Sequence, residues 1–180
     1  MGDLLFCCSD SANAITAVTS GVADLPIDHV AVVYRTGDSE NSWAVIEAVK
    51  PEVRITPLDD FLGENGAVLH ARVNVDFDVD ASVEHCLTMV GKPYDDLYLP
   101  GDSAVYCSEL VQLCYVNEAG DHVFDTVPMS FHDATGQVTE YWKAFYAQYG
   151  LTVPEGEPGT NPGELSRRPQ VTIIGKIPVK

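Results

Sequence analysis

Basic residues are scarce in this chain, and long apolar runs are absent. Its 180 residues include 10 Lys and Arg against 27 Asp and Glu, which gives a formal net charge of −17. A surface this acidic is repelled by nucleic-acid phosphates and by anionic lipid headgroups, so neither is expected as a partner. No stretch of about 18 apolar residues is present, which excludes an integral membrane helix.

Cysteine is also sparse. The five cysteines are an odd number and include no CxxC pair, so neither a disulfide framework nor a zinc ribbon is expected, and a reducing compartment fits. Residues 1–6 lack the basic start of a signal peptide, which predicts a cytoplasmic protein as the sequence stands. A leader removed from a longer precursor would instead place the protein in the cell envelope or periplasm.

Common cofactor and metal motifs are missing. The sequence contains no P-loop, GxGxxG, HExxH or GxSxG pattern. The segment from Asp76 to Asp80 begins like a calcium-binding EF-hand loop. That motif needs Gly at position six and Glu at position twelve, where this chain has Ala81 and Leu87. We therefore expect neither a metal nor an organic cofactor.

Enough apolar residues are present, at 46%, to fill the core of one domain spanning residues 1–180. Apolar runs between turn-forming residues predict strands, and 3.6-residue periodicity predicts helices, which together indicate an α+β protein. The predicted strands are 4–8, 28–35, 42–49, 53–56, 67–73 and 171–177. The predicted helices are 9–20, a short turn after Pro57, 81–90, 107–118 and 138–149. The Pro/Gly-rich segment 154–169 is expected to be an ordered loop or a wrapping arm.

The most informative segment is YCSELV at residues 106–111. Here Cys107 opens a predicted helix after a loop rich in Pro, Gly and Asp. A thiol at a helix N-terminus lies beside unpaired backbone N–H groups and the positive end of the helix dipole. Both favour the thiolate, which is the nucleophilic form. A cysteine in a helix is nevertheless often only a core residue.

A predicted hairpin supplies partners for this thiol. A five-residue loop over 36–40 would pair Arg35 with Asn41 and would place His29 directly opposite Glu47. Opposed side chains of antiparallel strands share a face, so the carboxylate would orient the imidazole and stabilise its protonated form. Cys107, His29 and Glu47 are therefore candidates for nucleophile, base and orienting residue. Each has a plainer structural interpretation: a core cysteine, a satisfied strand histidine and a solvent-facing glutamate.

Other polar and aromatic groups are weaker candidates. His132 could act as an alternative general base with Asp133 as its partner, but the nearby Pro and Gly favour a surface turn. The aromatic residues at helical spacing in 141–149 are typical of a core face rather than a ligand site.

Five short motifs occur in the order seen in permuted NlpC-like papain-fold cysteine hydrolases of the YaeF/YiiX type, and the resemblance covers residues 2 to 115. They are GDLLF from Gly2, DHVA from Asp28, VIEA from Val45, GKPYD from Gly91 and YCSELV from Tyr106.

The resemblance implies a circularly permuted papain-like fold, with an antiparallel sheet or small barrel packed against helices that include the nucleophile helix. It also implies that Cys107 is the nucleophile, His29 the base and Glu47 the third polar member. Tyr94 would line the substrate site. The permutation accounts for the order in which His29 precedes Cys107.

The expected function is a bacterial thiol hydrolase that cleaves an amide, peptide or isopeptide bond through a covalent acyl-enzyme. The resemblance suggests cell-wall peptides as substrates. One alternative is a lipid acyltransferase or phospholipase that uses the same Cys–His site. Another is a binding module with an inert cysteine. The residues leave open the substrate, the second oxyanion donor, the oligomeric state and the role of residues 154–170.

Overall fold

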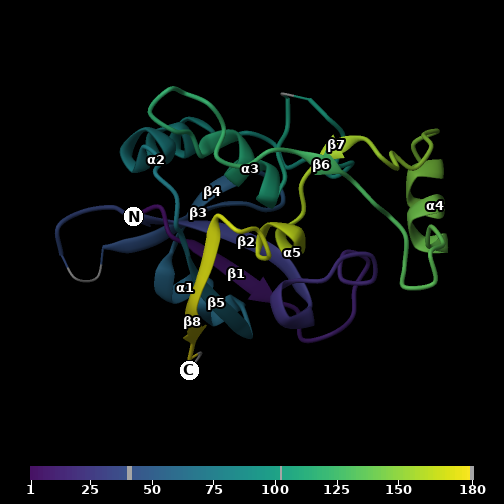
Figure 1. Cartoon of the computed structure of the whole chain (residues 1–180), viewed down its shortest axis with the longest axis horizontal. Helices are drawn as coiled ribbons and strands as arrows, with labels where there is room; N and C mark the ends of the chain where they lie inside the picture. The colour runs from purple at the N-terminus through teal and green to yellow at the C-terminus, as the bar shows by residue number, and fades with distance from the viewer. Residues whose placement is uncertain (40–41, 102, 179–180) are drawn as a thin grey trace.

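Six antiparallel strands form an open sheet at the centre of the computed structural model, which describes residues 1–39, 42–101 and 103–178 (Figure 1). Their order across the sheet is β4-β3-β2-β1-β5-β8. The strands are β1 (Leu4–Cys8), β2 (Ile27–Arg35), β3 (Trp43–Ala48), β4 (Val53–Pro57), β5 (Ala67–Val73) and β8 (Val171–Ile177). In the described residues the two edges do not meet, so the sheet is not the small barrel that was the other expectation.

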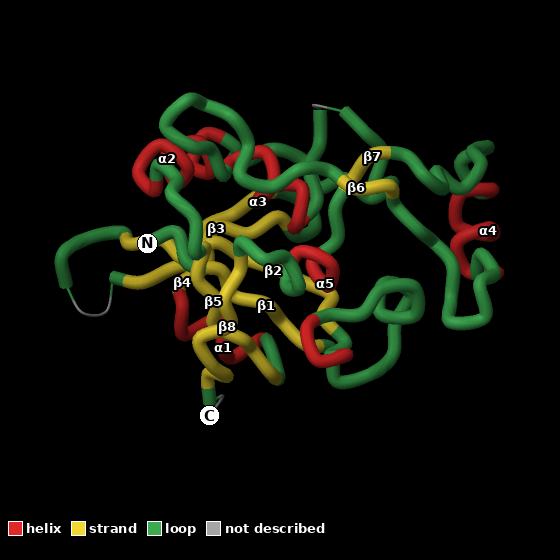
Figure 2. The backbone as a smooth tube through the Cα atoms, viewed as in Figure 1, coloured by secondary structure: helices red, strands yellow, loops and turns green. Residues whose placement is uncertain are grey.

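The helices lie on both sides of this sheet and beyond one end of it (Figures 1 and 2). They are the 3-10 turn η1 (Val22–Asp24), then α1 (Leu58–Glu64), α2 (Val79–Thr88), α3 (Cys107–Cys114), α4 (Glu140–Ala147) and α5 (Pro162–Leu165). A separate two-stranded pair joins β6 (Val127–Pro128) to β7 (Pro158–Gly159). No helix among the described residues has the length and apolar character needed to cross a membrane.

The central strand β1 shows why the sheet is covered on both faces. Its sequence, LLFCC, is an unbroken apolar run, which is typical of a strand buried on both sides. Leu4 and Phe6 pack in one cluster with Leu110 of α3, whereas Leu5 packs in another with Phe61 of α1. Helix α3 and the short helix α1 therefore cover opposite faces.

The predicted helix over 9–20 is wrong, because the structure has only turns there. Asn13 explains the difference. Its side-chain oxygen accepts hydrogen bonds from the backbone N–H groups of Ile15 and Thr16 at 3.0 and 2.9 Å. This is the pattern of an N-cap, so helical turns can begin only after Asn13 and not at residue 9. The Asn13 amide also donates to Asp28 at 2.6 Å, which anchors the turn to β2.

Other predicted elements exist but have different ends. The nucleophile helix stops at Cys114 rather than 118, because Tyr115 takes an extended conformation at its C-cap. The aromatic helix is shorter than 138–149 and begins after Thr139, whose side chain caps it. Strand β5 and strand β8 match their predicted bounds.

The segment 154–169 contributes β7 and α5. It packs against residues 20–22, near the beginning of the chain. Asn161 caps α5 by accepting a hydrogen bond from the Glu164 N–H at 2.6 Å. Ser166 accepts one from the Val22 N–H at 2.9 Å. Gly163 lies so close to the backbone of Ser20 that an added Cβ would be 2.9 Å from its carbonyl oxygen.

This close approach gives a first testable prediction. Gly163→Ala forces a backbone shift, and we expect it to lower the free energy of unfolding by about 1–3 kcal/mol in urea titrations. Gly63→Ala is the matched control, because a Cβ there meets nothing within 4 Å and Ala favours the helix. Equal stability of the two variants would contradict this account of the α5 packing.

Candidate active site

Cys107 is the first residue of α3, and its position is fixed by the residues around it. Tyr106 has extended backbone angles at the N-cap, which ends the preceding loop and starts the helix. The Glu109 carboxylate accepts a hydrogen bond from the Tyr106 N–H at 3.4 Å, as a capping side chain does. Cys107 is 5% exposed, so its thiol lies in a largely water-free setting beside the first-turn amides.

His29 lies near the start of β2, next to an irregularity in the sheet. Cys7 pairs with His29 and Cys8 with Ile27, so Asp28 is an extra residue in the β1–β2 ladder. A bulge of this kind bends the strand and changes the direction of neighbouring side chains. The His29 Nε2 atom is 2.8 Å from the Glu47 Oε2 atom, and the ring also interacts electrostatically with the Cys107 side chain.

Glu47 is almost completely buried, at 2% exposure, and is held by groups from two strands. Besides His29 of β2, it accepts hydrogen bonds from Thr56 Oγ1 at 2.6 Å and from Arg54 Nε at 3.1 Å, both on β4. A buried carboxylate needs such partners because leaving it unpaired would be costly. The structure thus joins Cys107, His29 and Glu47 in one continuous row of polar contacts.

The electrostatics of this row favour a charged imidazole. Burial opposes the charge on His29, but the hydrogen bonds to Cys107 and Glu47 outweigh it and raise its pKa to about 10. Burial likewise opposes the charge on Glu47, yet the hydrogen bonds from His29 and Thr56 lower its pKa to about 2. At neutral pH the pair is therefore an imidazolium and a carboxylate.

The predicted register of the hairpin differs from the observed one by two residues. Arg35 pairs with Trp43, not with Asn41, which lies outside the described residues. Continuing this register would place Ala31 opposite Glu47. A shift of two residues keeps every side chain on its original face, so His29 is a diagonal neighbour of Glu47 and still reaches it.

Tyr94 lines a pocket that also contains Cys107 in its wall. Its hydroxyl is 3.4 Å from that of Tyr98, and burial followed by the nearby Cys107 raises the pKa of its phenol. A neutral phenol in this setting is a hydrogen-bond donor.

Two groups of site residues received no functional role from the sequence: those that hold Glu47 and those that line the pocket. Arg54 and Thr56 hold Glu47, and a register for the β3–β4 pair would have found Arg54, which is directly opposite Glu47. Ile15 and Val18 line the pocket but were placed in a helix that does not exist. Trp142 belongs to the aromatic helix that was interpreted as core.

The weaker candidates lie apart from this row. His132 is 3.1 Å from the exposed Glu155, and His70 is 2.6 Å from Asp3. Among residues 1–39, 42–101 and 103–178, no three His, Cys, Asp or Glu side chains gather closely enough to hold a metal ion.

The model of the permuted papain-like amidase enzyme family (YaeF/YiiX, C92 family) matches residues 1–175. The chain belongs to this family. Because it is a family of cysteine peptidases and amidases, the chain is an enzyme of the cysteine hydrolase type, and the inert binding module is set aside.

Two relatives from Escherichia coli agree with this placement. The uncharacterized protein YiiX is 32% identical over 138 residues, which are 73% of this chain and 66% of that protein. The crystal structure of metalloprotein YiiX superimposes with a TM-score of 0.77 and 25% identity, and the match covers 98% of this chain and 96% of that one. The fold is therefore the permuted papain-like one.

The word metalloprotein describes that relative. In this chain the groups around Glu47 do not fit a metal ion. Its two carboxylate oxygens are engaged by His29, Arg54 and Thr56, and the Arg54 guanidinium would repel a cation.

The buried carboxylate of Glu47 predicts how the free energy of unfolding changes at acidic pH. Since the pKa of Glu47 is lowered in the folded state, its contribution to stability is present above the ordinary value of 4.5 and is lost as pH falls towards about 2. The difference in unfolding free energy between the wild type and Glu47→Gln should shrink by about 3 kcal/mol over this range. Urea titrations at several pH values measure it.

Glu64→Gln is the control, because Glu64 also pairs with Arg54 but is exposed. Its difference from the wild type should stay near zero throughout. A pH-independent gap for Glu47→Gln would contradict the assignment of a buried, ionised Glu47.

Proposed function

We propose that this enzyme cleaves an amide bond through a thioester formed on Cys107. The observation that supports it is the row Cys107–His29–Glu47, in which a thiol at a helix N-terminus interacts with an imidazole whose Nε2 atom is 2.8 Å from a buried carboxylate. This is the arrangement of an activated nucleophile, its base and an orienting group.

In the proposed reaction Cys107 attacks the carbonyl carbon as a thiolate, because its proton already resides on the His29 imidazolium. The C–N bond then breaks, and His29 donates its proton to the leaving nitrogen. Water attacks the thioester next while the now neutral His29 accepts its proton. The C–S bond breaks, the carboxylic acid product leaves, and the Cys107 thiolate and His29 imidazolium are restored. Glu47 stays ionised and stabilises the imidazolium in each half-reaction.

The tetrahedral intermediates carry a negative oxygen that needs donors. The backbone N–H of Cys107, in the first turn of α3, is one candidate. The Tyr94 hydroxyl is the second, because it lines the pocket beside Cys107 and burial keeps it protonated.

A second candidate function keeps the same residues and replaces the amide by a lipid ester, as in an acyltransferase or phospholipase. The apolar wall of the pocket favours it. Attack, acyl-enzyme and proton transfers would be unchanged, so the two functions differ in the substrate alone.

The first test is the reactivity of the thiol. We expect iodoacetamide at neutral pH to alkylate Cys107 at least about tenfold faster than Cys8, whose pKa is raised by burial. His29→Ala should slow alkylation of Cys107 and leave Cys8 unchanged. Peptide mapping by mass spectrometry measures both rates in one sample. Equal rates at the two cysteines would rule out an activated Cys107.

The second test concerns Tyr94. Tyr94→Phe should lower kcat by about tenfold or more with little change in KM, because an oxyanion donor acts only when negative charge develops. Hydrolysis of hexanoyl p-nitroanilide measures both constants. Tyr115→Phe is the control: it removes a fully buried hydroxyl that donates to the Gly2 carbonyl at 3.0 Å, away from the pocket. An unchanged kcat in Tyr94→Phe would remove this residue from the mechanism.

A further inference from the structure

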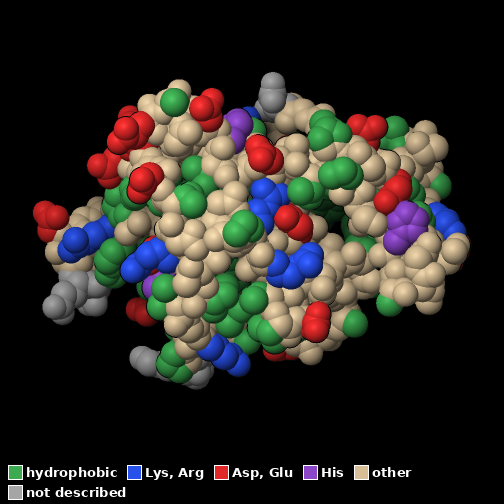
Figure 3. Space-filling view, viewed as in Figure 1, with side chains coloured by type: hydrophobic (Ala, Val, Ile, Leu, Met, Phe, Trp, Pro, Cys, Tyr) green, Lys and Arg blue, Asp and Glu red, His purple; other side chains and the backbone are tan. Residues whose placement is uncertain are grey.

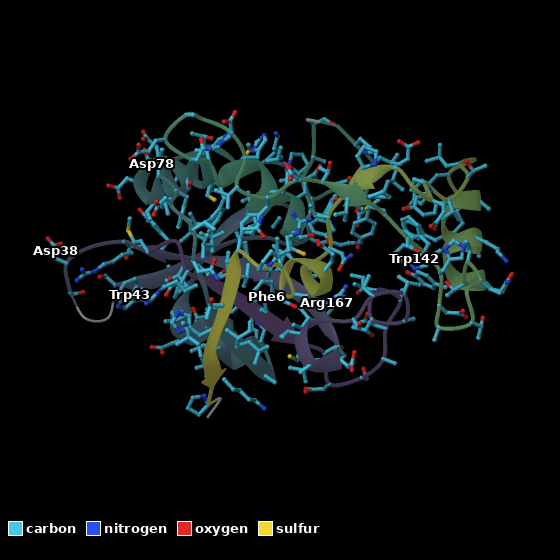
Figure 4. The ribbon with its side chains drawn as sticks, in the orientation of Figure 1. Phe6, Asp38, Trp43, Asp78, Trp142 and Arg167 are labelled. Atoms are coloured by element: carbon cyan, nitrogen blue, oxygen red, sulfur yellow. The ribbon has the colours of Figure 1, made fainter. Side chains whose placement is uncertain are left out.

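The pocket beside Cys107 has a wall of aromatic and aliphatic side chains. Tyr94, Tyr98 and Tyr106 come from the loop before α3, and Phe131 and Trp142 come from the segment that carries α4. Figure 3 shows a hollow between α5 and the α4 segment with hydrophobic side chains around it. In Figure 4, Trp142 lies on the side of α4 that faces the rest of the molecule.

The polar groups in this wall are already engaged. Ser108 accepts a hydrogen bond from Thr160 Oγ1 at 3.0 Å, and the Tyr106 hydroxyl accepts one from the Thr160 N–H at 3.0 Å. Asn161 caps α5. Among the residues that the structure describes, the pocket wall contains no Lys, Arg, Asp, Glu or His. A charged group placed here would therefore lose its water without gaining an opposite charge.

The position of His29 decides which part of the substrate enters the pocket. The described wall includes Cys107 but neither His29 nor Glu47. The leaving group has to receive its proton from His29, so it lies on the His29 side of the sulfur. The group that stays on the sulfur as a thioester is then left with the pocket, whose wall includes Cys107 but not the imidazole.

The size of the pocket sets a limit on that group. Its cavity volume is about 60 Å³, which corresponds to roughly four to six water-sized spheres. A chain of a few carbons or one small ring fills such a space. A long fatty acyl chain would extend beyond this space into the solvent.

From these observations we propose that the pocket is the acyl-binding site and that the substrate's acyl group is uncharged, apolar and short. This proposal rests on the proposed function and specifies its substrate class. It disfavours cell-wall peptides that would place a free carboxylate or ammonium on the acyl side of the scissile bond.

The test compares p-nitrophenyl esters that differ only in their acyl group. For acetate, butyrate and hexanoate we expect kcat/KM to rise by about fourfold per methylene until the cavity is filled. It should then fall for dodecanoate. Hydrogen adipate and aminocaproate esters match hexanoate in length but end in a carboxylate and an ammonium. Both should react at least about tenfold more slowly than hexanoate. Repulsion by the acidic protein surface alone would slow only the hydrogen adipate ester, because only that substrate is an anion.

Two variants introduce the same positive charge at neighbouring positions, one in the pocket wall and one at the surface. Val18 lines the pocket, whereas its neighbour Ala17 is exposed. Val18→Arg should lower kcat/KM for hexanoate at least about tenfold and raise it for hydrogen adipate relative to hexanoate. Ala17→Arg should leave the ratio of the two substrates as in the wild type.

The outcomes separate the two proposals. If no ester gives a burst of nitrophenol and Cys107 is not selectively alkylated, the proposed function fails and the pocket assignment fails with it. If a burst occurs but charged and neutral acyl groups react equally, or Val18→Arg and Ala17→Arg behave alike, only the pocket assignment is overturned.

Discussion

The buried carboxylate of Glu47 is the constraint on which the active site depends. At 2% exposure it has to be surrounded by donors, and those donors come from β2 and β4 on either side of its own strand. Meeting this requirement links side chains of three adjacent strands. It also holds the His29 ring through its Nε2 atom. The geometry of the candidate site and the burial of a charge in this half of the sheet are therefore coupled.

Much of the sheet could be predicted from local sequence, because its strands are continuous or alternating apolar runs between turn-forming residues. The pairing of His29 with Glu47 was also predicted, although its register was wrong by two residues. That error was harmless because side-chain direction repeats every second residue. An error of one residue would have separated the pair onto opposite faces.

The parts that could not be predicted depend on contacts distant in sequence or on single side chains. The turn at 13–19 replaces a helix because Asn13 satisfies its own neighbours and binds Asp28. The end of α3 is set by the extended Tyr115, whose ring is fully buried. The pocket needs side chains from four separate stretches of the chain. No local pattern shows that such stretches will meet, and an aromatic helix such as α4 looks the same whether it fills a core or lines a cavity.

The order of these stretches along the chain has a consequence for biosynthesis. His29 and Glu47 leave the ribosome early and Cys107 follows past the midpoint, but Thr160 and Pro162, which close the pocket, come some fifty residues later still. The last part of the wall therefore becomes available only after the residues of the Cys107–His29–Glu47 row have been made, so closing the pocket depends on the segment that is synthesised after α4.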